Sequence, residues 1–323
     1  MHHSIRIALG PLVACIAVTL PAFGQEYPSR PIRVVVPFAA GGGGDVVTRI
    51  VTQRLSNNLG KSVVVENRTG GSGITGTQIV ATAVPDGYTL LQGSATTLAV
   101  LPFMTKLPYS PSDFVPITVL GSQPHVVVVP VALPVKTLRE LVALAKRRPG
   151  ELNYGSSGNG GPNHLGTELF KLDAGIDVAH IPYKGNGLVL IDLVAGQIQL
   201  GIMSLAPTLP HINSGKLRAL AVTSPARLPV LPQMPTVAEL GYPGYEVRSW
   251  YGLFAPARTP QPILLKLNEE IAAVLKQRDT LEIFTAQGVE PGGNSLEQFA
   301  DFMKSETDRW GRVVKAINLK VDS

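Results

Sequence analysis

The sequence is short of charged residues, cysteine and long apolar runs, and each shortage excludes a class of protein. Charged residues make up 16% of the 323 residues and hydrophobic residues 45%, which is opposite to the composition of disordered chains. No uncharged apolar stretch of about 18 residues follows the N-terminal segment, which excludes a multispan membrane protein. The net charge of +5 comes from scattered basic residues, so no nucleic-acid partner is expected.

Residues 1–24 have the pattern of a signal peptide. Arg6 supplies a positive charge, an uncharged apolar run covers 7–20, and small residues precede a cleavage site at Gly24. Cleavage there removes the only cysteine, Cys15, and predicts a periplasmic mature chain without disulfides or thiolate metal ligands. Two alternatives stay open, namely an uncleaved N-terminal membrane anchor and lipid attachment at Cys15.

Three motifs that would indicate an enzyme or a metalloprotein are incomplete. Gly71–Gly76 fits G-x-G-x-x-G, but the strand that follows ends Leu91-Gln92-Gly93, without the acid that a dinucleotide ribose needs. Gly155–Gly158 is not G-x-S-x-G, and no His and acid accompany it. The histidines of the mature chain are far apart in sequence. We therefore expect no catalytic residues, no metal and no cofactor.

The order of strand and helix patterns indicates two α/β units. In the first, a β-branched run at 32–36 leads through a glycine-rich loop, with Asp45 as the expected N-cap, into a helical repeat over 46–59. In the second, a strand at 152–155 leads through a Ser/Gly loop into a helix over 163–172. Alternating strands and helices predict mostly parallel sheets flanked by helices.

The pattern is interrupted near residues 119–126 and 247–252. These two junctions indicate that the chain crosses twice between its domains. We expect domain 1 to combine residues 25–122 with 250–323, so that the C-terminal helices pack on the N-terminal unit. Domain 2 then spans residues 123–249.

The loops that precede the two helices are candidate anion sites. A helix N-terminus presents unpaired N–H groups and a partial positive charge, and glycine lets a ligand approach the backbone closely. The loops at 39–44 and 156–163 both have these properties, and on facing domains they would hold an anion from two sides. The alternative is that their glycines only form tight turns between strand and helix.

Several side chains near these loops have two interpretations each. Asp45 either caps its helix only or also accepts a hydrogen bond from the ligand. Lys184 either pairs with a carboxylate or is a solvated loop lysine, and His164 is either a donor to the ligand or structural. Ser94 and Thr96 follow the third strand and are candidate hydroxyl donors that would orient a ligand.

An ordered series of short motifs resembles the Bug proteins, the extracytoplasmic solute receptors of the tripartite tricarboxylate transporter family. The resemblance extends from about Tyr27 to Trp310. The motifs that carry it are Tyr27–Arg33, Pro37–Asp45, Val63–Arg68, Pro85–Leu90, His180–Gly185, Leu220–Thr223 and Pro235–Gly241.

The resemblance implies a two-domain Venus-flytrap fold that closes on one small carboxylate, held partly through ordered water. It places the carboxylate on the loops after the first strands of the two domains, with Lys184 and Gly185 at the rim. Together with the side chains considered above, the candidate ligand-binding residues are Phe38, Ala39, Ala40, Gly41, Gly42, Asp45, Ser94, Thr96, Ser156, Ser157, Gly160, Asn163, His164, Lys184 and Gly185.

The sequence thus predicts a monomeric, non-enzymatic periplasmic binding protein. Hinges near the two junctions would let the domains close on a small carboxylate, and membrane subunits of a tripartite tricarboxylate-type transporter would recognise the closed form. Two alternatives remain. One is a receptor that passes its ligand to a signalling system, and the other is a secreted hydrolase.

Overall fold

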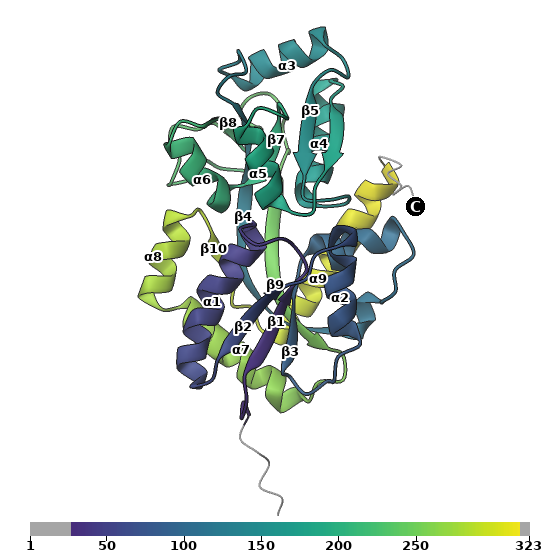
Figure 1. The fold of residues 1–323 in the computed structure, drawn as a ribbon, viewed down its shortest axis with the longest axis vertical. Coiled ribbons are helices and arrows are strands. Elements are labelled where there is room, and N and C mark those ends of the chain that lie inside the picture. The colour runs from purple at the N-terminus through teal and green to yellow at the C-terminus, as the bar shows by residue number, and fades with distance from the viewer. Residues whose placement is uncertain (1–26, 317–323) are drawn as a thin grey trace, which may run out of the picture.

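The computed structural model describes residues 27–316, which form two lobes stacked along the long axis of the molecule (Figure 1). Two long strands run from one lobe to the other, β4 (Phe114–Pro130) and β9 (Arg248–Pro256). No helix within residues 27–316 has both the length and the apolar character of a membrane span. The predicted signal peptide and the alternatives at Cys15 lie outside the described residues.

The lower lobe is built on a sheet whose centre is β1 (Ile32–Val36). This strand pairs in parallel with β2 (Val63–Asn67) on one side and with β3 (Thr89–Gly93) on the other. The strand order is β10-β4-β9-β3-β1-β2, where β10 is Glu290–Pro291. The central strand is fully apolar but for Arg33, as expected for a strand with helices on both faces.

Helices from both ends of the chain cover this sheet (Figure 1). As predicted, the C-terminal helices return to the lower lobe, where Leu264 and Leu267 share a core with Val47 and Val51. The helices of the lower lobe are α1 (Gly43–Leu59), α2 (Ile74–Ala81), α7 (Gln261–Leu275), α8 (Arg278–Ala286) and α9 (Leu296–Ala316).

The upper lobe is built around the distal half of β4. That half pairs with β7 (Gly201–Ser204) and β8 (Leu217–Val222), while β5 (Asn153–Ser156) and β6 (Ala179–Pro182) form a separate parallel pair. The helices of this lobe are α3 (Leu138–Arg147), α4 (Pro162–Ala174), α5 (Asn186–Val194) and α6 (Leu205–Asn213).

The predicted two-lobed α/β architecture is confirmed, but the expectation of mostly parallel sheets is wrong. The pairings of β4 with β7, β8, β9 and β10, and of β3 with β9, are all antiparallel. Every one of these antiparallel pairs contains a crossing strand, β4 or β9, whereas the strands that stay within one lobe pair in parallel. Apolar periodicity identifies a buried strand but carries no information on its direction.

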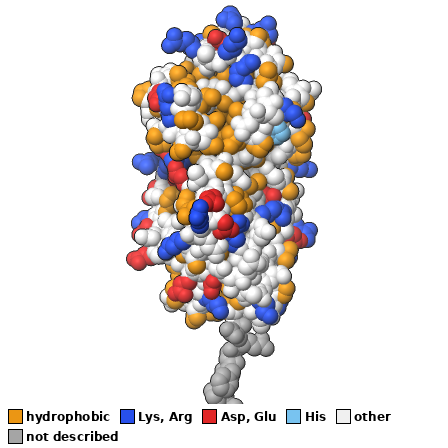
Figure 2. All heavy atoms as spheres, turned by 90° about the vertical axis from the view of Figure 1, so that its left-hand side faces the viewer, with side chains coloured by type: hydrophobic (Ala, Val, Ile, Leu, Met, Phe, Trp, Pro, Cys, Tyr) orange, Lys and Arg blue, Asp and Glu red, His pale blue; other side chains and the backbone are white. Residues whose placement is uncertain are grey.

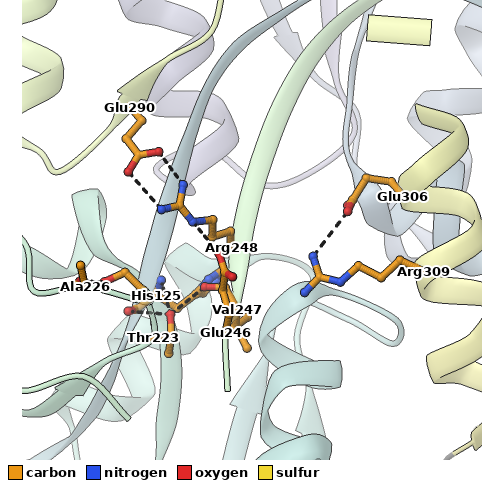
Figure 3. A network of polar contacts seen from close by, with 10 residues as sticks. His125, Thr223, Ala226, Glu246, Val247, Arg248, Glu290, Glu306 and Arg309 are labelled. Carbon is orange, nitrogen blue, oxygen red and sulfur yellow. Dashed lines mark hydrogen bonds and ion pairs between the residues drawn. The ribbon is translucent and has the colours of Figure 1, made fainter. Parts of the chain in front are cut away.

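Polar contacts fix the crossing strands to the lower lobe (Figure 3). Arg248 on β9 pairs with Glu246 and with Glu290 of β10. The buried carboxylate of Glu306 on α9 accepts a hydrogen bond of 2.7 Å from Trp250 Nε1 on β9 and one of 2.9 Å from Trp310 Nε1. The second crossing is therefore held in place by the C-terminal helix.

The outer surface differs between the lobes. Seen from the left-hand side of Figure 1, the lower lobe carries interleaved acidic and basic side chains (Figure 2). Basic side chains gather at the tip of the upper lobe, where α3 exposes Arg139, Lys146 and Arg147.

Candidate ligand site: a cavity between the lobes

A cavity lies between the lobes, where the loops of both meet the crossing strands. The lining residues are Phe38, Ala39, Gly42, Gly43, Gly44, Asp45, Gln92, Ser94, Thr96, His125, Ser157, Pro162, Asn163, Asn186, Ser249 and Tyr251.

Helix starts from both lobes border this cavity. Helix α1 begins at Gly43, and its first intrahelical bond is donated by the Val46 amide to the Gly42 carbonyl. In helix α4 the first intrahelical bond runs from the Leu165 amide to the Gly161 carbonyl. Helix α5 begins at Asn186. The amides that precede these first bonds have no partner within their helices, and their partial positive charge favours an anion.

The loop that starts α1 lies directly against the crossing strands. A Cβ atom at Gly43 would overlap the side-chain nitrogen of Gln123 and the hydroxyl of Tyr251. A Cβ atom at Gly44 would lie 2.8 Å from Gln92 Oε1. Glycine is required at both positions because the backbone itself forms the wall of the cavity.

Asp45 is not the N-cap of α1, which corrects the prediction. Gly42 is the N-cap, and Asp45 is the third residue of a helix that starts earlier than its apolar repeat. From there its carboxylate accepts bonds of 3.0 Å from the Gly41 amide and from Asn67 Nδ2, and pairs with Arg49. The N-cap was misplaced because the two glycines that open the helix have no apolar periodicity.

The contacts of Asp45 determine its charge. Burial acts to raise its pKa, but the bonds from Arg49, Gly41 and Asn67 outweigh burial and hold the pKa below its usual value. Both carboxylate oxygens are engaged within the loop. Asp45 therefore shapes the loop as a fixed negative charge.

A stack of three rings supports the loop of the upper lobe. The rings of His164 and His180 lie 4.0 Å apart, and Tyr154 stacks on His180 at 4.8 Å. His180 Nε2 lies 2.6 Å from Ser156 Oγ, and the Gly160 amide donates to His164 Nδ1 at 3.0 Å. Ser156 and His164 thus hold the loop from behind and do not line the cavity.

Burial keeps the histidines near the site neutral. It lowers the pKa of His164 to about 3, assisted by His180 and Lys171, and that of His180 to about 4. Burial also lowers the pKa of His125 to about 4. None of these rings is a cation at neutral pH.

Side chains of the upper lobe and the crossing strands form a continuous polar chain at the cavity. Ser157 Oγ donates to Asn163 Oδ1 at 3.1 Å, and Asn163 Nδ2 donates to Asn186 Oδ1 at 2.9 Å. Asn186 Nδ2 donates to Ser204 Oγ at 3.3 Å, and that hydroxyl lies 3.3 Å from Tyr251 Oη. These mutual bonds fix the orientation of the amides and hydroxyls at the cavity.

The structure brings about half of the predicted site residues together. Those that line the cavity are Phe38, Ala39, Gly42, Asp45, Ser94, Thr96, Ser157 and Asn163. Ala40 and Gly41 are exposed on the same loop. Gly160 belongs to the second loop but faces Met104 and Val100 of the lower lobe, and it does not line the cavity.

Lys184 and Gly185 lie at the rim and differ in their contacts. The Lys184 side chain is exposed and does not line the cavity, and no ion pair to it occurs among residues 27–316. Gly185 touches the other lobe, because a Cβ atom there would lie 2.9 Å from the Cβ of Ala39. A Cβ atom at Gly187 would lie 3.0 Å from the Ala40 carbonyl oxygen. The two lobes are therefore in direct contact at this rim.

Gly43, Gly44 and Pro162 also line the cavity, and they lie within the two loops predicted as anion sites. Sequence reasoning missed five lining residues, namely Gln92, His125, Asn186, Ser249 and Tyr251. Gln92 ends a buried strand, and His125 and Ser249 interrupt the apolar runs of the crossing strands. A polar residue inside a buried strand was the available signal.

No lysine or arginine side chain lines this cavity in the part of the chain that the structure describes. Nor do residues 27–316 hold a group of three or more His, Cys, Asp or Glu side chains placed to bind a metal ion. Attraction for an anion must therefore come from backbone amides and neutral donors. Two α/β lobes, two crossing strands and an interlobe cavity at facing helix starts define a solute-binding protein.

Comparisons with known proteins agree with this class and give the family. Residues 47–319 match the family described as "Tripartite tricarboxylate transporter family receptor". The chain is 39% identical over 316 residues to Protein BugT of Bordetella pertussis, and the match covers 97% of each chain. The chain belongs to this family of periplasmic solute-binding receptors, so the prediction of a binding protein in place of an enzyme is confirmed.

Two similar solved structures contain carboxylates. One is the Rhodopseudomonas palustris protein Rpa4515 with adipate, 37% identical with a TM-score of 0.88, covering 91% of this chain and 99% of that one. The other is MatC from Rhodopseudomonas palustris with bound malate, 33% identical with a TM-score of 0.84, and the match covers 89% of this chain and 100% of that one. Both are similar to this chain over nearly their whole length.

Proposed function

We propose that this protein captures a small organic carboxylate in the interlobe cavity and delivers it to the membrane subunits of a tripartite tricarboxylate-type transporter. The observation that carries the proposal is that helices from both lobes begin at one cavity. No cationic side chain is among the residues that line this cavity. Unpaired amides at helix starts suit a carboxylate and need no salt bridge.

The relatives support a carboxylate as the guest. Rpa4515 holds adipate and MatC holds malate, so two receptors of the same fold, each more than 30% identical to this chain, take small organic acids.

Closure of the lobes is part of the proposal. Domain 1 comprises residues 25–122 and 250–323, domain 2 comprises 123–249, and the hinges lie where β4 and β9 pass between them. Contacts between Gly185 and Ala39 across the rim correspond to the closed arrangement. The mature protein begins after Gly24, acts in the periplasm and is a monomer.

Thermal denaturation of the mature chain, residues 25–323, tests the binding function. Adipate and malate are the first probes, and their dimethyl esters are matched controls that lack the charge. A ligand present at 100 times its Kd stabilises the native state by about 2.7 kcal/mol, so the Tm should rise by several degrees with a bound acid only. Equal shifts with acids and esters, or no shift with any carboxylate, would refute capture of an anion.

The transport role is tested by affinity capture from detergent-solubilised membranes with the ligand-loaded protein. Recovery of multispan transporter subunits supports delivery to a transporter. Recovery of a membrane kinase with an extracytoplasmic domain would instead support the sensing alternative.

A further inference from the structure

Gln92 and Ser94 are two polar residues of the cavity with unused hydrogen-bonding atoms. They lie at and just beyond the carboxyl end of β3, and their exposed fractions are 1% and 6%. Both line the cavity, yet Gln92 Oε1 and Ser94 Oγ have no hydrogen-bond partner among residues 27–316. Buried polar atoms are nearly always paired, so a ligand is the natural partner of these two.

The orientation of the Gln92 amide determines what kind of group it can bind. Its Nε2 donates to the Gly93 carbonyl at 2.8 Å, which leaves Oε1 as the free atom. That oxygen lies beside Gly44, at the start of α1. A carbonyl oxygen only accepts hydrogen bonds, so its partner must be a donor.

The charges around this position disfavour a second carboxylate. Asp45, which is paired with Arg49, lines the same cavity, and no Lys or Arg side chain among the described residues does so. A carboxylate beside Gln92 Oε1 would meet an acceptor and a nearby negative charge. A hydroxyl, amine or amide N–H would instead satisfy the glutamine oxygen.

We propose that Gln92 Oε1, together with Ser94 Oγ in the same cavity, forms a subsite that recognises a hydrogen-bond donor on the bound acid. The receptor therefore selects organic acids that carry a hydroxyl or amine over acids of the same skeleton that lack it. This inference rests on the proposed function, because the helix starts must hold the carboxylate for the donor to reach Gln92.

Isothermal titration of the mature chain with matched pairs of acids tests the subsite. Malate is compared with succinate, and 6-hydroxyhexanoate with hexanoate, so that each pair differs by one hydroxyl. We expect at least one hydroxy acid to bind about tenfold or more tightly than its partner, because the partner leaves Gln92 Oε1 without a hydrogen bond.

Variants at Gln92 test whether Gln92 Oε1 is the cause of the preference for hydroxy acids. Gln92→Leu and Gln92→Met both remove the acceptor at similar size, and each should reduce the preference to below about threefold. Gln287→Leu is the matched control, since Gln287 Oε1 is also buried and unpartnered but lies outside the cavity, at the end of α8. This control should keep the full preference.

The possible results separate the subsite from the function. Equal binding of the acids within both pairs, or a full preference retained in either Gln92 variant, would overturn the subsite while leaving carboxylate capture intact. Failure of all four acids and of adipate to bind would refute both proposals.

Discussion

The two loops that face each other across the cavity are held in place by different means. The loop of the lower lobe is glycine from 41 to 44 and is fixed by the contacts of Asp45 with Arg49 and Asn67. The loop of the upper lobe rests on the stacked rings of His164 and His180. One loop depends on a fixed charge and the other on neutral aromatic packing.

This difference separates anion capture from selection. The lower loop offers only backbone along its glycines, so under the proposed function it would hold any carboxylate of suitable size. Side chains that distinguish one guest from another come from the upper lobe and the strand ends, such as Asn163, Asn186 and Gln92. Changes to the lower loop should alter affinity for all acids, whereas changes to these side chains should alter the order of preference.

The largest effect is expected from blocking contact between the lobes. In Gly187→Val, the new Cβ would lie 3.0 Å from the Ala40 carbonyl oxygen, with the two methyl groups extending beyond it. Apart from its chain neighbours and the backbone of its own helix, that Cβ would meet no other atom of residues 27–316 within 4 Å, so the upper lobe should still fold. We expect titration to show a loss of affinity of about tenfold or more for every bound acid.

Gly187→Ala is the graded control for this substitution. A single methyl group needs a shift of only a few tenths of an ångström, so the loss should be smaller than for valine. Small-angle scattering should show the valine variant extended in the presence of ligand. Wild-type affinity in Gly187→Val would contradict closure at this rim.

A smaller effect is expected from Asp45→Asn, which keeps the size of the side chain and removes its charge. The bonds from Arg49 and the Gly41 amide weaken, so the unfolding free energy should fall by about 1–3 kcal/mol and affinity by several-fold. Asp86→Asn is the matched control, because its pair with Arg30 is exposed and contributes about 0–1 kcal/mol. Equal effects of both substitutions would show that the loop does not depend on Asp45.

Acid should also reveal the charge of Asp45. Because its pKa is lowered in the folded state, Asp45 contributes stability above its unfolded pKa of about 3.9, and this contribution is lost as the pH falls further. Urea denaturation from pH 5 to pH 3 should therefore show a shallower loss of stability in Asp45→Asn than in the wild type. Parallel curves would mean that the pKa of Asp45 is not lowered.

The ring stack of the upper lobe predicts a pH dependence in a different range. Burial lowers the pKa of His180 to about 4, whereas in the unfolded chain it is about 6.5. The unfolded state then binds more protons below pH 6.5, so stability falls from there towards pH 4 by up to about 1.4 kcal/mol per pH unit for one histidine.

His180→Gln should reduce this slope. The amide can still bond to Ser156 Oγ but does not titrate. Unfolding free energies from urea denaturation at pH 7, 6 and 5 measure the slope in both proteins. An unchanged slope in the variant would mean that His180 is not buried and neutral in solution.

The smallest effect is expected from Lys184→Met. The side chain is exposed and outside the cavity, so removing its charge should change affinity for adipate or malate by less than about twofold. A tenfold or greater loss of affinity would show that Lys184 does interact with the carboxylate.

Local sequence signals predicted the elements that depend on local chemistry. The apolar run at 32–36 coincides with β1, and the strand expected at 152–155 overlaps β5. Thr137 precedes α3, and its Oγ1 accepts from the Glu140 amide at 3.1 Å, as its spacing from Glu140 indicates. Gly60 ends α1 in the left-handed conformation expected of a C-cap glycine.

Tertiary structure determined the features that were missed. Helix α6 contains Pro207 and Pro210, residues that disfavour a helix interior, and it was not predicted. His125, Ser249 and Tyr251 reach the cavity only because two strands far apart in sequence cross between the lobes at the same place. Neither apolar periodicity nor a sequence motif predicts that residues from two distant strands will lie at the same place.

A crystal structure of the mature protein with a bound acid tests the central claim most directly. The account predicts a carboxylate oxygen within about 3 Å of the amides of Gly43 or Gly44, or one ordered water away, and facing the start of α4. A carboxylate bound instead to a lysine or arginine side chain, or located outside the interlobe cavity, would contradict it.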